Sequence, residues 1–347
     1  MLRKTDMNST SIPIIDLEGF YGSDSSEHLR IAMQIDDACR NIGFFSVIGH
    51  QVPAELIAQV DSSSREFFAL PLEHKLALKR PKDDQVRGYS AIGNEGLSYS
   101  LGKKAPGDLK ESLSIGPIAP PDEPYYSEAM AGPHFAPNLF PPEVPLLKQS
   151  WEEYFEAMAS LAADLMRLFA IGLALPNDYF DSKIDKHISM FRVLHYPNQA
   201  DEPEAGQLRA GAHSDYGSLT ILKVEDRPGG LQVFSKDKEW VNVPVVPNAF
   251  LVNIGDLMMQ WTNDQWVSTL HRVVNPPRDL SMASARQSLV FFHQPNYDAV
   301  VECLPSCLAK GEAPKYAPIS SGDHLRNKFL AQTTFGQSNT VGSKEAI

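Results

Sequence analysis

The hydrophobic pattern of the chain changes character near its middle. Up to residue 175, apolar side chains recur mostly three and four positions apart, which is typical of helices with one buried face. From residue 187 onward they recur mostly two positions apart, in short runs separated by Gly, Pro, Asn and Asp. The pattern therefore predicts an α+β chain in which helices support a strand-rich half.

The first part of the chain, residues 1–175, is predicted to be mainly helical. Its longest helix is expected over residues 143–175, where apolar positions follow a helical period throughout. An earlier helix is expected over residues 25–43, and the side chains expected to face the core there are Leu29, Met33, Ile35 and Ile42. The other elements predicted in this part are helices beginning at Pro53 and spanning 71–79, and strands over 12–17 and 44–50.

Two segments show no sustained hydrophobic period. Residues 80–143 are rich in Pro, Gly, Asp and Ser, and a loop this long in a compact protein is usually functional. We therefore expect this segment to be a substrate-binding loop. The polar tail over residues 336–347 is expected to be disordered.

The strand-rich part is expected to form an antiparallel sandwich or barrel. The predicted strands lie within residues 187–197, 218–224, 229–234, 239–245, 249–256, 267–274 and 286–294. The Pro-Gly-Gly sequence at 228–230 is interpreted as a hairpin turn and not as a phosphate-binding loop, because no helix follows it.

Composition and charge restrict the possible partners. An apolar share of 43% with 21% charged residues describes an ordinary globular protein, and the net charge of −12 argues against binding to nucleic acid or to an anionic membrane. A small-molecule partner is therefore expected. The sequence has no apolar run of membrane-spanning length and no signal peptide at its start, and its three cysteines suggest reduced thiols, so we expect a cytoplasmic location. The oligomeric state is not indicated.

A possible metal site begins in the sequence RAGAHSDYGSLTIL. His213 and Asp215 stand two positions apart, so in an extended chain both side chains point to the same side. An isolated pair of this kind is usually only a strand end and a turn. A third ligand, His271, stands in WVSTLHRVVNPP within the same strand-rich half. Two histidines and one carboxylate form the facial triad of non-haem iron oxygenases, whereas the HExxH sequence common in zinc hydrolases is absent.

A candidate anion site follows His271 along the chain. Arg286 and Ser288 in ARQSLVFF share one face of a predicted strand, and a guanidinium beside a hydroxyl can bind a carboxylate. The alternative is an arginine in a surface ion pair. This alternative is disfavoured because a charged side chain in so apolar a run requires a partner.

These sequences together resemble the Fe(II)- and 2-oxoglutarate-dependent oxygenases of the isopenicillin N synthase-like branch. The resemblance covers nearly the whole chain and includes, in family order, IPIIDL, GFFSVIGHQVP, REFFALPLEHK, DLKESLSIG, AHSDYGSLTIL, GGLQV, NIGDLMMQWTND and STLHRVVNPP. It implies a single catalytic domain over residues 1–347. Its core would be a double-stranded β-helix, or jelly roll, over residues 187–295, supported by the N-terminal and central helices.

The resemblance also implies a chemistry. His213, Asp215 and His271 would bind Fe(II), while Arg286, Ser288 and Tyr196 would hold the distal carboxylate of 2-oxoglutarate. O2 would be consumed, succinate and CO2 released, and a small polar substrate oxidised, above all by hydroxylation. Many plant members carry an asparagine two residues before this tyrosine, but here the residue is Leu194, which places one hydrogen bond to the co-substrate in doubt.

Two other functions stay open at this point. Isopenicillin N synthase keeps the same motifs but performs an oxidative cyclisation without 2-oxoglutarate, although the present sequence resembles thymine-oxidising hydroxylases more closely. Alternatively, a jelly roll can be a catalytically inactive binding protein. The presence of every ligand and of the Arg-Ser pair argues against this second alternative.

The substrate itself is not defined by these motifs, but a wall for it can be predicted. Strand alternation puts Met190 and Arg192 on the same face as Tyr196. A buried Arg192 would bind either the substrate or a protein carboxylate such as Asp108 or Glu111. The remaining residues expected to contact the substrate are Arg87 and Tyr89, Phe292 from across the barrel, and Phe335 on a segment that could close as a lid.

Several other polar residues are expected to be structural. We expect Lys110 and Glu111 to form an ion pair with each other near the end of a loop. His187, His195 and His293 are expected to be hydrogen-bonded residues of the core or rim and not metal ligands.

Overall fold

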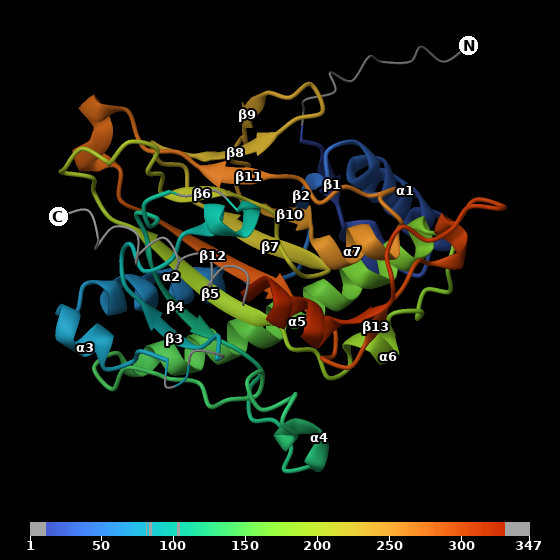
Figure 1. The fold of residues 1–347 in the computed structure, drawn as a ribbon, viewed down its shortest axis with the longest axis horizontal. Helices are drawn as coiled ribbons and strands as arrows, with labels where there is room; N and C mark the ends of the chain where they lie inside the picture. The colour runs from blue at the N-terminus through green and yellow to red at the C-terminus, as the bar shows by residue number, and fades with distance from the viewer. Residues whose placement is uncertain (1–11, 81, 83–84, 103–104, 330–347) are drawn as a thin grey trace.

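The computed structural model describes residues 12–329 apart from 81, 83–84 and 103–104. The largest element is an eight-stranded sheet (Figure 1). Its strands, in spatial order, are β1 (Ile14–Asp16), β2 (Phe44–Ile48), β10 (Phe250–Ile254), β7 (Leu219–Val224), β12 (Arg286–His293), β5 (Met190–Tyr196), β4 (Glu111–Ile115) and β3 (Gly88–Ser90).

A smaller sheet completes the β-structure of the core. Its strands, in spatial order, are β6 (Ala210–His213), β11 (His271–Val273), β8 (Leu231–Phe234) and β9 (Trp240–Asn242). A separate pair, β13 (Val300–Val301) and β14 (Ile319–Ser320), lies near the C-terminal end of the described chain. The two larger sheets, antiparallel apart from the parallel pair β1–β2, confirm the predicted α+β fold with a double-stranded β-helix core.

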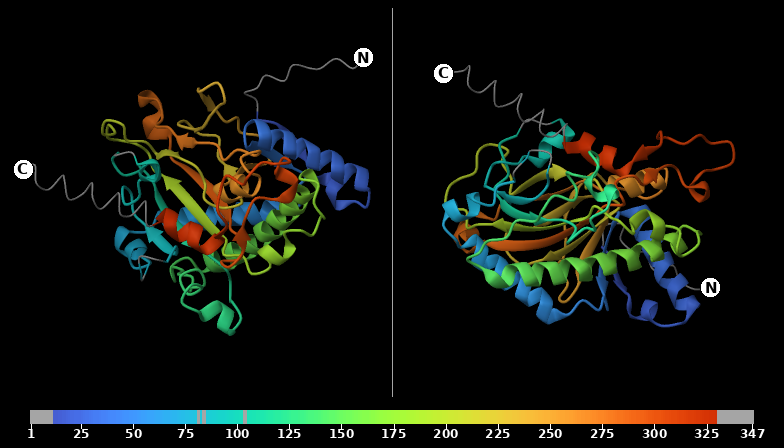
Figure 2. Two further views of the ribbon diagram at one scale, coloured as in Figure 1. Left: turned by 45° about the vertical axis from the view of Figure 1, so that its right-hand side comes forward. Right: turned by 90° about the horizontal axis from the view of Figure 1, so that it is seen from below.

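Helices cover one face of the large sheet. The helices are α1 (Ser25–Asn41), α2 (Ala54–Phe68), α3 (Leu72–Leu76), α4 (Pro124–Ser127), α5 (Pro145–Gly172), α6 (Asp181–Ile184) and α7 (Asp256–Trp261), and residues 321–329 are also helical. The 3-10 helices are η1 (Glu18–Tyr21), η2 (Leu97–Leu101), η3 (Arg278–Ala283) and η4 (Pro305–Cys307). Figure 2 shows α5 lying along the large sheet, where it contacts β7 and β12, while α1 and α2 pack against α5.

Alternation along β5 separates the core from the interior of the jelly roll. Phe191 and Val193 are fully buried in the hydrophobic core that includes α5. The intervening residues Met190, Arg192 and Leu194 line a cavity on the opposite face. The two-residue period of this strand therefore assigns its residues to core or cavity as the sequence predicted.

The N-terminal half contains more β-structure than its sequence pattern predicts. Strands β1 to β4 all come from this half and form both edges of the large sheet. The segment 80–143, expected to be one long loop, contains β3, η2, β4 and α4. The alternating Leu113 and Ile115 of β4, both fully buried, were the available sequence evidence for a strand there.

Helix α1 buries a different face from the one expected. Leu29 and Met33 are each 51% exposed, whereas the small residues Ala32 and Ala38 are buried. These alanines permit close helix packing: a side chain on Gly172 of α5 would lie only 3.0 Å from the Ala32 carbonyl oxygen. The prediction that Leu29 and Met33 face the core is therefore wrong, whereas Ile35 and Ile42 are buried as predicted.

Within the described part of the chain, no helix combines the length and the apolar character needed to cross a membrane. The expected disordered tail over residues 336–347 and the expected lid residue Phe335 lie outside the described residues.

Candidate metal centre and adjoining cavity

A cavity of about 420 Å³ lies in the interior of the jelly roll. It is lined by residues of both large sheets, together with residues 86–87, 93–97 and 133–134 from the N-terminal half. Nearly all of the site residues predicted from the sequence meet there: His213, Asp215, His271, Arg286, Ser288, Tyr196, Met190, Arg192, Arg87 and Phe292. Tyr89 does not line this cavity.

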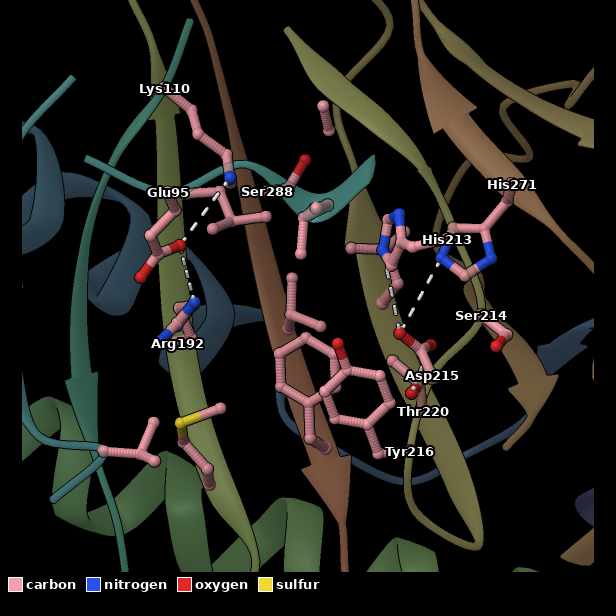
Figure 3. A pocket seen from close by; sticks show the side chains of 18 of the residues that line it. Glu95, Lys110, Arg192, His213, Ser214, Asp215, Tyr216, Thr220, His271 and Ser288 are labelled. Carbon is pink, nitrogen blue, oxygen red and sulfur yellow. Dashed lines mark hydrogen bonds and ion pairs between the residues drawn. The ribbon is translucent and has the colours of Figure 1, made fainter. Parts of the chain in front are cut away.

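Three side chains converge at one side of the cavity (Figure 3). His213 ends β6 and His271 begins β11, and these two residues pair directly across the strands. Asp215 follows in the connection to β7, and its Oδ1 lies 3.9 Å from His213 Nε2 and 3.7 Å from His271 Nε2. The candidate ligand atoms all lie within 4.8 Å of one another. The two-residue spacing thus places His213 and Asp215 on one side, as expected.

Backbone carbonyls fix the orientation of both imidazoles. His213 Nδ1 lies 2.8 Å from the Gly211 carbonyl oxygen, and His271 Nδ1 lies 3.1 Å from the Thr269 carbonyl oxygen. A carbonyl oxygen only accepts, so each Nδ1 carries the proton and donates it. Each Nε2 therefore presents a lone pair toward Asp215, which is the form that binds a metal.

The carboxylate of Asp215 is oriented in a similar way. Its Oδ2 accepts hydrogen bonds from Thr220 Oγ1 at 2.6 Å and from Asn253 Nδ2 at 2.7 Å, which leaves Oδ1 facing the histidines. Burial opposes ionisation of Asp215, but the two neighbouring histidines and these hydrogen bonds outweigh it and lower its pKa. Burial, reinforced by His271, lowers the pKa of His213 to about 3. The donor set is therefore two neutral imidazoles and one carboxylate, which suits Fe(II).

A buried guanidinium lies farther along the large sheet. Arg286 is only 2% exposed and pairs across the strands with Tyr196, while Ser288 pairs with Leu194. Arg286 Nη1 donates to the Gly229 carbonyl oxygen at 2.8 Å, but its Nε has no hydrogen-bond partner among the described residues. Burial lowers the pKa of Arg286. A charged group with an unused donor in this position is suited to bind a carboxylate.

Arg192 faces the cavity as predicted, but its protein partner differs from the two candidates. Its Nη1 lies 3.1 Å from Glu95 Oε2, and its Nε donates to Ser114 Oγ at 2.8 Å. Lys110 lies 3.6 Å from the same Glu95 oxygen (Figure 3). It also lies 2.8 Å from Asp108 Oδ2. Neither Asp108 nor Glu111 pairs with Arg192, because Asp108 pairs with Lys110 and Glu111 points to the opposite face of β4.

The expected pair of Lys110 and Glu111 does not form. Successive residues of a strand face opposite sides, so Lys110 lines the cavity while Glu111 enters the region below the sheet. There Glu111 accepts from Lys75 Nζ at 2.8 Å and from Tyr89 Oη at 2.5 Å. The prediction that Tyr89 contacts the substrate is therefore wrong, because its side chain packs in the core beside Phe67.

Phe292 lies in the cavity wall, but not across the barrel from β5. It pairs with Met190 of the adjacent strand and, on its other side, with Thr220. This register places Phe292 next to the side chain that holds Asp215. Met190 and Phe292 therefore form one continuous wall near the metal site.

The remaining histidines lie outside the candidate metal group. His195 approaches Glu111 at 2.8 Å and stacks on Phe68, while His293 Nδ1 approaches Ser218 Oγ at 2.7 Å, as expected for hydrogen-bonded residues. His187 stacks on Phe155 and lies outside the metal group, and its Nδ1 has no hydrogen-bond partner among the described residues. Burial lowers the pKa of His187 to about 4.

Three residues of the site were missed from the sequence. Asn253 interrupts the apolar run FLVNI, and a buried amide in such a strand was detectable evidence for a specific partner. Thr220 fits any strand by its propensity, so its hydrogen bond to Asp215 had no sequence counterpart. Glu95 lies in a segment without a period, and only the fold brings it to Arg192.

Comparison with known families matches most of the chain. Residues 12–143 match a model described as the N-terminal region of non-haem dioxygenases in morphine synthesis, and residues 187–295 match the 2OG-Fe(II) oxygenase superfamily. The three candidate metal ligands and most of the residues that line the cavity therefore fall within matched regions.

Individual relatives cover nearly the full length. A 2-oxoglutarate-Fe(II) type oxidoreductase of Emericella nidulans is 37% identical over 93% of this chain and 90% of its own. A homoarginine-6-hydroxylase of Oryza sativa subsp. japonica is 32% identical over 92% of this chain and 97% of its own. A thymine hydroxylase of Neurospora crassa, whose crystal structure contains alpha-ketoglutarate and thymine, is 32% identical, with a TM-score of 0.81 over 95% of this chain and 98% of the other.

Proposed function

Because this chain belongs to the 2OG-Fe(II) oxygenase superfamily and is a non-haem iron dioxygenase, we propose that His213, Asp215 and His271 hold its Fe(II). The observation that carries this assignment is the fixed orientation of the three donors. Both imidazoles direct Nε2 toward Asp215 Oδ1, because both Nδ1 protons are donated to backbone carbonyls. A metal held by these three ligands would be accessible to reactants from the cavity.

We also propose that Arg286, Ser288 and Tyr196 bind the distal carboxylate of 2-oxoglutarate. Arg286 is buried beside Tyr196, has an unused Nε donor and shares a strand face with Ser288. The Leu194 side chain adjoins Ser288 across the strands and supplies an apolar surface in place of a further hydrogen bond. The charge-assisted contacts of Arg286 would therefore provide most of the specificity for a dicarboxylate.

The protein's own contribution is to position the reactants and to exclude water. When bound, Fe(II) and 2-oxoglutarate supply the oxidising chemistry, which consumes O2 and releases succinate and CO2. The apolar side chains of Leu222 and Val290 line the intervening wall and restrict solvent near the metal. Arg192, Arg87, Met190 and Phe292 line the same cavity and would hold the substrate near the metal.

The proposed reaction is hydroxylation of a small polar organic molecule within one catalytic domain formed by the whole chain. Relatives named homoarginine-6-hydroxylase and a structure with bound thymine support a small polar substrate. The net charge of −12 disfavours nucleic acid as a partner, and the free Cys39, Cys303 and Cys307 agree with a cytoplasmic location.

The test is reconstitution of the full chain with Fe(II) under anaerobic conditions, followed by measurement of O2 uptake and succinate release with and without 2-oxoglutarate. We expect both to require 2-oxoglutarate and to increase when a small-molecule screen supplies the substrate. Substrate-dependent O2 uptake without 2-oxoglutarate would instead support an oxidative cyclase. A protein that neither binds Fe(II) nor releases succinate would be a binding protein.

A further inference from the structure

Arg87 shares an unusual environment with Arg286. Both line the cavity, and they are only 5% and 2% exposed. Both donate hydrogen bonds to backbone carbonyl oxygens alone, and the Nε of each has no partner among the described residues. Arg87 therefore has the same features that suit Arg286 to a carboxylate ligand.

No carboxylate among the described residues balances the charge of Arg87. Its Nη1 donates to the Val86 carbonyl at 2.8 Å and its Nη2 to the His134 carbonyl. Burial lowers its pKa to about 10, so it remains cationic at neutral pH, and no carboxylate contributes to the shift. In the described chain no acidic side chain forms an ion pair with it, although a buried charge ordinarily requires one.

Two other cations of the cavity already have carboxylate partners. Arg192 pairs with Glu95, and Lys110 pairs with Asp108, at 3.1 and 2.8 Å. Arg80 also lines the cavity and, after Arg192 and Lys110, contributes to the lowered pKa of Glu95. Arg87, by contrast, has no carboxylate partner among the described residues.

The register of the large sheet separates the two unpaired guanidiniums. Arg286 lies level with Tyr196, at the opposite end of β5 from Met190. Arg87 immediately precedes β3, whose Gly88 pairs with Ser114, and Ser114 pairs in turn with Arg192. Arg286 is therefore separated from the metal side along the direction of the strands. Arg87 is separated from it across the sheet, because β12, β5 and β4 lie between β7 and β3.

We propose that Arg87 binds a carboxylate of the substrate, so that the enzyme oxidises a small carboxylic acid at a carbon several bonds away from that group. This inference rests on the proposed function, because it takes the open positions at the metal as the place of oxidation. The separation between the substrate carboxylate and the oxidised carbon follows from the width of the sheet. Neighbouring strands stand about 4.8 Å apart, and several strands separate β7 from β3. The Arg192–Glu95 pair then offers a donor and an acceptor to neutral polar groups between the two ends.

A purely structural role for Arg87 makes a different prediction. Its bonds to Val86 and His134 join two segments of backbone, and that role does not depend on whether a ligand carries a charge. A carboxylate-binding role requires that an acid bind better than its uncharged amide. Comparing each acid with its carboxamide separates these two roles.

The experiment uses the Fe(II)- and 2-oxoglutarate-loaded full chain without O2, with calorimetric titration of hexanoate, 4-methylbenzoate and their carboxamides. In the wild-type protein we expect at least one acid to bind ten- to a hundredfold more tightly than its amide, the range for a charge-assisted hydrogen bond. Arg87→Gln should reduce that ratio to near one, and Arg87→Lys should keep part of it. Arg278→Gln is the matched control, because Arg278 also donates to backbone carbonyls but is exposed on η3.

Two outcomes overturn the proposal. One is a wild-type protein that binds none of the acids more tightly than its amide. The other is an Arg87→Gln protein with the wild-type ratio. Thermal unfolding of each variant identifies a folding defect. If Arg87→Gln has such a defect, the acid-to-amide affinity ratios of Arg87→Lys and of the wild type decide whether the proposal stands. Failure of the proposed function is separate, since it appears as loss of Fe(II) binding and of 2-oxoglutarate-dependent succinate release in the wild type.

Discussion

The metal side and the substrate side of the cavity are held together by contacts of different range. On the metal side, His213 and His271 are each oriented by a carbonyl two residues earlier in the chain. On the substrate side, Arg192 is held by Ser114 and Glu95, which lie 78 and 97 residues away in the sequence. The first arrangement is encoded locally and the second by the whole fold.

This difference explains how one iron site can serve many substrates. A ligand oriented by its own strand keeps its geometry when distant loops change. The substrate wall draws on residues 86–87, 93–97 and 133–134, so substitutions there should change what is bound without moving a metal ligand. The two sides should therefore respond separately to mutation.

The largest effect is expected from removing a metal ligand. His213→Ala, Asp215→Ala and His271→Ala should each abolish turnover and weaken Fe(II) binding by more than about a hundredfold, because loss of an outer hydrogen bond alone costs ten- to a hundredfold. Metal content and succinate release measure the two effects. Asp279→Ala, at an exposed aspartate, should change neither. Full activity in any ligand variant would disprove the assignment.

On the substrate side, a substitution is expected to reduce oxidation of the substrate without stopping decarboxylation of 2-oxoglutarate. Arg192→Leu should reduce substrate-coupled turnover by about a hundredfold, while substrate-independent decarboxylation of 2-oxoglutarate continues. The measurement compares product formation with succinate release for the substrate found in the screen. Because Arg192 also neutralises Glu95, the Arg192→Leu/Glu95→Gln double variant is the necessary control. Recovery of turnover in the double variant would show that Arg192 has only a structural role.

Substitution of Arg286 tests whether 2-oxoglutarate binding can be weakened without a change in Fe(II) binding. Arg286→Gln should raise the KM for 2-oxoglutarate ten- to a hundredfold through loss of a charge-assisted contact, with Fe(II) affinity unchanged because the guanidinium is remote from the ligands. Succinate release over a range of 2-oxoglutarate concentrations measures the first quantity, and anaerobic iron titration the second. An unchanged KM would count against the proposed carboxylate site.

A smaller effect is expected from the hydrogen bonds behind the metal. Asn253→Ala removes the 2.7 Å bond to Asp215 Oδ2, and we expect Fe(II) affinity to fall about tenfold. Asn242→Ala is a suitable control. Asn242 lies on β9 at the edge of the smaller sheet and accepts a hydrogen bond from Gln232 of β8. If both variants bind Fe(II) like the wild type, Thr220 alone is sufficient to orient the carboxylate.

The same contrast in range limits what the sequence reveals. The ligands and the Arg286–Ser288 pair are predictable because alternation over two residues fixes a face without knowledge of the fold. The pairing of Arg192 with Glu95 is not, because Asp108, Glu111 and Glu95 are equivalent as sequence candidates. β4 could have been recognised from its alternating Leu113 and Ile115, but its place beside β5 depends on the completed sheet.

The smallest expected effect on activity concerns Tyr89, which the sequence placed on the substrate side and the structure places behind it. Tyr89→Phe removes the 2.5 Å hydrogen bond to Glu111, a carboxylate that Lys75 and His195 still contact. We expect unchanged kinetic constants but a loss of about 1–2 kcal/mol in the free energy of unfolding at neutral pH, measured by denaturant titration.

This loss should depend on pH in a defined direction. Burial opposes ionisation of Glu111, but His195, Lys75 and Tyr89 outweigh it and lower its pKa below the usual 4.5. The stabilisation is therefore present above the unfolded-state pKa and is lost as the pH falls through the lower folded-state value. The difference between wild type and Tyr89→Phe should accordingly shrink in acid. A changed KM for the substrate, with an unchanged free energy of unfolding, would instead indicate that Tyr89 contacts the substrate.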